Sequence, residues 1–196
     1  MRTLRGLSIV EMIVTLSIVS IVGIALVESI LFFYRANTSS LEQVQQVETV
    51  RRGIELFVRD VREATYADTG AYPLAHIGTS TITFYADTDV DTRIERIHYT
   101  LVGTSLFRVV TEATGTPATY TGGSATTTVS THVRNNEDGL SLFKYYNASS
   151  TAITDSDSIA DVVSVTISPI VDVVEKHAPG RFTLIESATI RNLRAQ

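Results

Sequence analysis

A long apolar run near the N-terminus constrains this chain more than any other feature. Residues 7–27 contain a single charged side chain, that of Glu11. An α-helix rises about 1.5 Å per residue, so the run spans about 32 Å, close to the thickness of the hydrocarbon core of a bilayer. The sequence therefore predicts a membrane-spanning helix over residues 7–34, ending in three aromatic residues suited to the membrane interface.

The flanking residues predict the orientation of this helix and argue against its removal as a signal peptide. Arg2 and Arg5 precede the run, so the positive-inside rule leaves the N-terminus in the cytoplasm. The run is about twice as long as the core of a signal peptide, and no small-x-small cleavage site follows it. A plain transmembrane anchor is the simplest alternative. It leaves Glu11 unexplained, because a carboxylate at membrane depth costs about 2.5–3.5 kcal/mol.

The stretch Gly6–Val14, GLSIVEMIV, resembles the processing site of type IV prepilins and pseudopilins. In that family a membrane peptidase cuts after the glycine on the cytoplasmic side and methylates the new N-terminal residue. The resemblance implies that residues 1–6 are a cleaved leader, that Leu7 is the methylated N-terminus, and that Glu11 is the family's signature acid. Leu7 departs from the phenylalanine that usually follows the cut.

Glu11 would have a physical role in a filament of such subunits. Cleavage after Gly6 leaves a positive amine on Leu7, one helical turn from the carboxylate. When apolar helices bundle, Glu11 can neutralise the amine of its own subunit or of a neighbour. Removing one partner of such a pair is costly in a low dielectric, and the best-attested use of such pairs is to fix register. The resemblance therefore implies that Glu11 serves filament assembly.

A helical stripe continues beyond the membrane segment. Apolar residues recur every three or four positions from Leu41 to Val61, and no proline occurs in residues 1–72. The pattern predicts one helix of about sixty residues from Leu7 onward, far longer than the mean of ~11–12 in globular proteins. Residues 35–66 form its amphipathic continuation, with Gly53 as the one weak interior position.

Four arginines of this continuation, between residues 51 and 62, raise the question of nucleic-acid binding. Acidic residues interleave with them on the same expected solvated face: Glu48, Glu55, Asp60 and Glu63. The pairs Glu48–Arg52 and Glu55–Arg59 have the favourable i,i+4 spacing. The net charge of the chain is −5, which disfavours a general phosphate-binding surface. We interpret the arginines as part of a solvated helix face and predict no direct nucleic-acid partner.

Two further stretches narrow the family resemblance. RRGIELFVRDVREA, residues 51–64, is similar to a helix of J-type minor pseudopilins and W-type minor pilins, which often carry an R-D-apolar-R-[QE]-A run. The ending IRNL, residues 190–193, resembles a common terminus of the same proteins. The resemblance implies an α+β, pilin-like fold in which the long N-terminal helix packs on an antiparallel β-sheet domain.

The periodicity past residue 66 changes from helical to alternating. Glycine and proline punctuate a loop up to residue 78. Three strands with short connections then predict an antiparallel meander: residues 79–85, 93–101 and 105–110. Threonine-rich residues 111–131 are expected to form a flexible loop or a weak edge strand.

The remaining residues complete a β-rich domain, residues 67–196, which is expected on the outer side of the membrane. Additional strands are predicted over three segments: residues 139–146, 162–167 and 181–193. A continuation over residues 170–174 follows the second of them.

The residue types exclude several kinds of chemistry. The chain has no cysteine, so disulfides and thiolate sites are ruled out. Its four histidines are dispersed without ligand spacing, and there is no nucleophile elbow or glycine-rich phosphate loop. We therefore predict no catalytic residue, no cofactor and no enzyme activity.

One acidic turn has the beginning of a calcium loop. Asp87, Asp89 and Asp91 have the first three ligand spacings, but an EF-hand would place glycine at Thr92 and glutamate at His98. We interpret these residues as a solvated β-turn, with calcium binding as the alternative.

The function implied by the resemblance is structural. The chain would be a minor pilin or pseudopilin of a type IV pilus or a type II secretion pseudopilus, stored in the bacterial inner membrane before assembly. The implied partners are the prepilin peptidase, major and minor pilin or pseudopilin subunits, the inner-membrane assembly platform and membrane lipid. The alternative is an extracytoplasmic enzyme or binding protein on a single transmembrane helix, whose N-terminus resembles a prepilin by accident.

Overall fold

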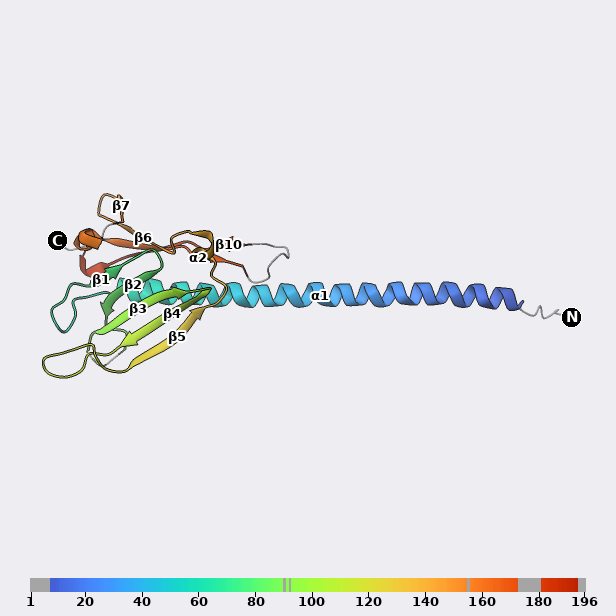
Figure 1. The fold of residues 1–196 in the computed structure, drawn as a ribbon, viewed down its shortest axis with the longest axis horizontal. Coiled ribbons are helices and arrows are strands. Elements are labelled where there is room, and N and C mark those ends of the chain that lie inside the picture. The colour runs from blue at the N-terminus through green and yellow to red at the C-terminus, as the bar shows by residue number, and fades with distance from the viewer. Residues whose placement is uncertain (1–7, 90, 92, 155, 173–180, 194–196) are drawn as a thin grey trace. The chain divides into compact units, whose positions relative to one another are not determined.

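The computed structural model of the protein describes residues 8–89, 91, 93–154, 156–172 and 181–193 (Figure 1). The chain divides into two compact units, Met1–Val44 and Gln45–Gln196. The long helix α1 (Ile9–Arg62) contributes to both. Gly6 and Leu7, the expected cleavage and methylation site, lie outside the described residues.

The first unit contains the apolar segment of α1. Residues Ile9–Arg35 are helical, have a mean hydropathy of 2.5, and are unburied by the rest of the chain. Within the described residues this is the one helix long and apolar enough to cross a membrane. The prediction of an N-terminal helix of membrane-spanning length and composition is thus confirmed.

The second unit contains a five-stranded antiparallel sheet in the order β1-β2-β3-β4-β5. Its strands are β1 (Leu74–Ile77), β2 (Thr81–Ala86), β3 (Glu95–Val102), β4 (Ser105–Thr111) and β5 (Ser124–Ser130). Alternate residues of β3 face the core, which is the pattern expected of a half-buried strand. The α+β class and the antiparallel meander β2-β3-β4 are therefore confirmed.

A second antiparallel sheet has the order β11-β8-β6-β7, and β10 pairs with β9. These strands are β6 (Phe143–Tyr146), β7 (Ala152–Ile153), β8 (Ser164–Ile167), β9 (Ile170–Val171), β10 (Phe182–Thr183) and β11 (Glu186–Thr189). Three short helices complete the described part of the unit: α2 (Asn135–Asp138), η1 (Ser156–Asp161) and η2 (Arg191–Leu193).

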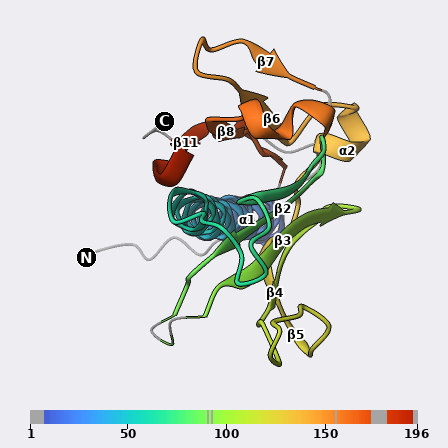
Figure 2. The ribbon, with the colours of Figure 1, turned by 90° about the vertical axis from the view of Figure 1, so that its left-hand side faces the viewer.

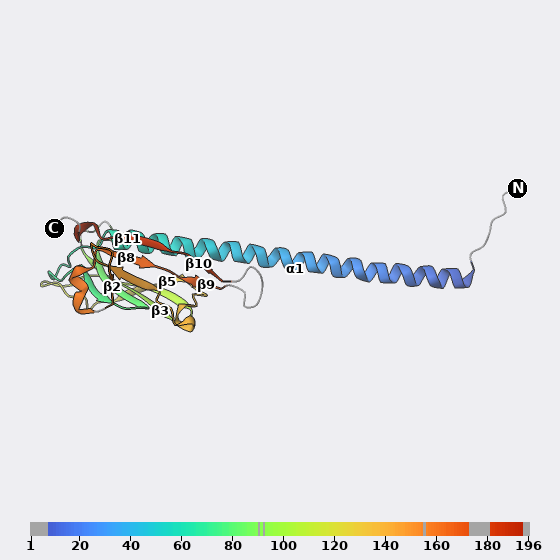
Figure 3. The ribbon, with the colours of Figure 1, turned by 90° about the horizontal axis from the view of Figure 1, so that it is seen from above.

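The C-terminal turns of α1 form the centre of the core. Figure 2 shows them between β3 and β4 on one side and β8 and β11 on the other, and Figure 3 shows β11 running beside the helix. Phe57 contacts both sheets, because its ring lies 5.1 Å from that of Tyr99 on β3 and 5.3 Å from that of Phe143 on β6. One helical stripe thus joins the two sheets.

The structure decides three local expectations. The loop expected before residue 79 contains β1, which pairs with β2 across a register shift between Leu74 and His76. The edge-strand alternative for residues 111–131 is correct for β5. The helix ends at Arg62, before the expected boundary at residue 66, because Thr65 N donates to Tyr85 O at 2.8 Å and Ala64 bridges to Ala86. The chain leaves the helix to pair with β2.

Candidate functional site

The apolar segment of α1 satisfies its small polar groups internally. The hydroxyls of Thr15, Ser17 and Ser20 donate to the carbonyls four residues earlier at 2.8–2.9 Å. Such bonds let hydroxyl side chains remain in an apolar environment without an unmet donor. Phe32 and Phe33 are both 69% exposed. This surface therefore needs a covering that residues 8–35 themselves do not provide.

Glu11 and Glu28 are the two acids of this segment, and both are exposed. Glu11 lies in the first turns of α1, and its backbone carbonyl accepts the Thr15 hydroxyl at 2.9 Å. Its carboxylate forms no hydrogen bond or ion pair with the described residues, so the acid of the expected assembly contact is available to a group outside them.

The acidic turn between β2 and β3 is built by strand pairing. Ala86, the last residue of β2, pairs with Glu95, the first of β3, so the turn carrying Asp87 and Asp89 closes over Glu95. Backbone contacts hold its far end, since Ile94 N donates to Asp68 Oδ2 at 3.2 Å and Tyr120 OH donates to Ile94 O at 2.8 Å. Ile94, which precedes β3, is therefore held by the loops that carry Asp68 and Tyr120.

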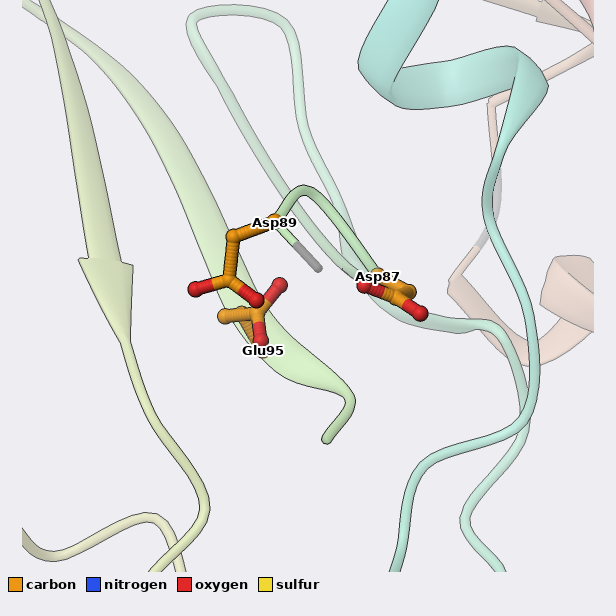
Figure 4. A group of neighbouring side chains, drawn as sticks. All are labelled: Asp87, Asp89 and Glu95. Carbon is orange, nitrogen blue, oxygen red and sulfur yellow. The ribbon is translucent and has the colours of Figure 1, made fainter. Parts of the chain in front are cut away.

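Three carboxylates converge at this turn. Figure 4 shows Asp89 and Glu95 side by side, with Asp87 on the same turn. One oxygen from each of these three residues lies within 4.8 Å of the other two. Glu95 is only 1% exposed, and Thr88 donates to its Oε2 from N at 2.8 Å and from Oγ1 at 3.1 Å. Its Oε1 is buried without a hydrogen-bond partner, as is Oδ1 of Asp87.

The electrostatics of this cluster follow from its burial. Desolvation raises the pKa of Glu95 above its ordinary value, and the charges of Asp89 and Asp87 raise it further against the lowering effect of the Thr88 bonds. The site therefore concentrates negative charge around a carboxylate that already lacks solvent.

The acids that converge at this turn differ from the three that the sequence offers as calcium ligands, Asp87, Asp89 and Asp91. Asp91 does not join the cluster, because its Oδ1 accepts the backbone N–H of Arg93 at 2.8 Å in a local turn. Glu95 takes its place, which the spacing of a calcium loop does not predict. The alternation of the strand does indicate the position of Glu95, since Glu95, Ile97 and Tyr99 are every second residue of β3 and lie on its buried face. The acid therefore occupies a core-facing position.

A second buried acid, Asp60, was expected on the solvated face of the helix and lies instead in the core, at 0% exposure. Its Oδ2 accepts from Tyr99 OH at 2.8 Å and from Arg108 Nε at 2.7 Å. Burial and then the charge of Asp60 raise the pKa of Tyr99 well above its ordinary value. Burial acts to lower the pKa of Arg108, but the hydrogen bond and charge of Asp60 outweigh it. The trio joins α1, β3 and β4.

The surface charges of α1 pair partly as expected. Arg52 binds Glu48 at 3.1 Å, as its spacing predicts. Glu55 binds Arg51 at 3.1 Å rather than Arg59, which forms an ion pair with Asp60 at 3.5 Å. The expected Glu55–Arg59 pair is therefore wrong, because Arg59 lies next to the buried Asp60.

Two of the dispersed histidines meet on the sheet. His76 and His98 both pair with Thr83 across neighbouring strands, and Thr83 Oγ1 lies 2.8 Å from His98 Nδ1. Burial, followed by the charges of His76 and Arg96, lowers the pKa of His98. The fourth histidine, His177, lies outside the described residues.

The comparisons with known proteins add no assignment: no protein-family model matches the chain, and no curated protein matches it.

Proposed function

We propose that this protein is a minor pilin or pseudopilin, a structural subunit that assembles through the N-terminal part of α1. The observation that carries the proposal is the apolar stretch of that helix, exposed over Ile9–Arg35 and interrupted near its start by Glu11. A plain anchor gains nothing from a carboxylate at that depth. A helix that bundles with copies of itself gains a register contact.

The rest of the chain supports the same role. α1 continues into the second unit, where its stripe is buried by antiparallel sheets. In a pilin-like subunit this arrangement ties a folded outer domain to the helix that enters the filament. The proposed life cycle begins in the inner membrane, where the prepilin peptidase removes residues 1–6 and methylates Leu7. The subunit then passes through the assembly platform into a filament with other pilins or pseudopilins.

Replacement of Glu11 tests the assembly step. In a host with the matching peptidase and filament genes, Glu11→Val should still be cleaved, while the fraction of subunit recovered in sheared filaments falls about tenfold, because the amine of Leu7 loses its counter-charge. Immunoblotting of the membrane and filament fractions measures both steps.

Glu28→Gln is the matched control. It removes the other acid of the apolar segment of α1, which we place at the outer interface, so incorporation should stay near that of the wild type. Equal incorporation of the Glu11→Val and wild-type proteins would overturn the register role of Glu11.

A further inference from the structure

We propose that the turn between β2 and β3 is a binding site for one calcium ion, held by Asp87, Asp89 and Glu95. This inference does not depend on the filament role, because it rests on the second unit alone. A group of acidic side chains is not a site by itself. Glu95 is a member of this cluster, and its buried, unpartnered Oε1 is the observation that points to a cationic ligand.

The position of Glu95 is costly without such a partner. Its side chain is 1% exposed and stands on the core-facing side of β3, where Ile97 and Tyr99 follow. A buried oxygen without a hydrogen bond has lost its hydration without compensation, which costs free energy. The two neighbouring carboxylates add electrostatic repulsion. Thr88 donates both of its hydrogen bonds to Oε2. A cation beside Oε1 would offset both costs at once.

The geometry and donor type select the ion. Calcium binds carboxylate oxygens at about 2.3–2.6 Å, so oxygens on one ion are separated by at most about 5 Å. The three oxygens here lie within 4.8 Å of one another. Hard oxygen donors favour calcium or magnesium over transition metals. Calcium is the better match for an uneven set of carboxylates, since magnesium demands a near-ideal octahedron.

The charges around the site leave the carboxylates free for an ion. Arg59, Arg62 and Arg191 line the same open depression, of about 680 Å³, as Asp87 and Asp89. Among the residues that the structure describes, none of these arginines forms an ion pair with either acid. The first of them is engaged by Asp60 at 3.5 Å. Within the described residues, Asp89 accepts the backbone N–H of Asp91 at Oδ1, at 3.0 Å, which leaves its second oxygen available.

Calorimetric titration of the full-length protein in detergent, after treatment with a chelator, tests the proposal. Calcium chloride is the probe and magnesium chloride the comparison. The wild type should bind one calcium ion with a dissociation constant of about 10⁻⁴–10⁻³ M, the range of extracellular calcium modules. Asp89→Asn should weaken binding by about tenfold or more, since it removes ligand charge.

Asp91→Asn is the matched control. It changes the next acid of the same turn and keeps the oxygen that accepts the Arg93 N–H, so calcium affinity should stay within about twofold of the wild type. Because Asp89 and Asp91 are both exposed, this comparison does not depend on a buried substitution.

Glu95→Gln gives a second, independent readout in thermal unfolding followed by circular dichroism. It relieves the repulsion and keeps an oxygen for Thr88, so without calcium this variant should melt at a higher temperature than the wild type. Calcium should then raise its melting temperature by less than it raises that of the wild type.

Three results would overturn the site. They are an absence of saturable binding up to about 10 mM calcium, an equal loss of affinity in Asp89→Asn and Asp91→Asn, and magnesium binding as tight as that of calcium. If Glu95→Gln does not fold, the comparison of the two aspartate variants decides.

Discussion

At the scale of single residues, two acids in the core distinguish this domain. Asp60 and Glu95 both occupy positions in phase with buried apolar neighbours, one on α1 and the other on β3. They differ in their partners. Asp60 has a cationic partner in Arg108 at 2.7 Å, whereas among the described residues the carboxylate of Glu95 accepts hydrogen bonds from the neutral Thr88 alone. The first is therefore a structural ion pair, and the second is a candidate ligand.

Asp60→Asn tests the structural pair. The substitution leaves the guanidinium of Arg108, whose side chain is 14% exposed, without its counter-charge. We expect the free energy of unfolding to fall by about 3 kcal/mol, the lower end for breaking a buried pair. Urea unfolding of the full-length protein in detergent, followed by circular dichroism, measures it.

Glu63→Gln is the control for this prediction, because Glu63 is an exposed acid on the neighbouring turn. Its effect should be within about 0.5 kcal/mol. If Asp60→Asn costs no more than Glu63→Gln, the pair contributes nothing to stability and our account of Asp60 is wrong.

At the scale of elements, α1 packs unusually close to β5. A Cβ atom added at Gly53 would lie 2.4 Å from Cγ1 and 3.0 Å from the carbonyl oxygen of Val129. The glycine that weakens the helix in isolation is therefore the residue that lets helix and strand approach. Propensity alone ranks this position as a defect.

Gly53→Ala should destabilise the domain by about 1–3 kcal/mol through overpacking, although alanine favours the helix by about 1 kcal/mol. Gly23→Ala is the matched control, since an added Cβ there meets nothing within 4 Å. Thermal unfolding measures both. In a Val129→Ala background the destabilisation caused by Gly53→Ala should be smaller, because the clashing methyl group is gone. A Gly53→Ala single variant as stable as the wild type would show that the close approach of helix and strand is absent.

The elements also show how far sequence patterns reach. Alternation over residues 93–101 and 105–110 predicts β3 and β4, because their inner faces are apolar. β1 is missed because its four residues, LAHI, alternate too briefly to stand out. Asp60 and Glu95 are missed because a charge is assigned to solvent by default. Their burial depends on groups far along the chain, as Arg108 lies 48 residues from Asp60.

At the scale of the whole molecule, the two units have opposite needs. The second unit buries apolar side chains in its own core. The apolar segment Ile9–Arg35 of the first unit is not buried by the described residues. Exposed apolar surface of this extent requires lipid or other helices. In the role proposed for this protein, the subunit would exchange the lipid for the helices of other subunits as it moves from the membrane into a filament.

The mass of the mature protein tests the central proposal most directly. We expect that the chain purified from membranes of a host with a prepilin peptidase lacks residues 1–6, begins at Leu7 and carries one methyl group there. In a host without the peptidase the leader should remain. A full-length, unmethylated chain in the host with an active peptidase would contradict the proposal and leave a simple membrane anchor as the account of this helix.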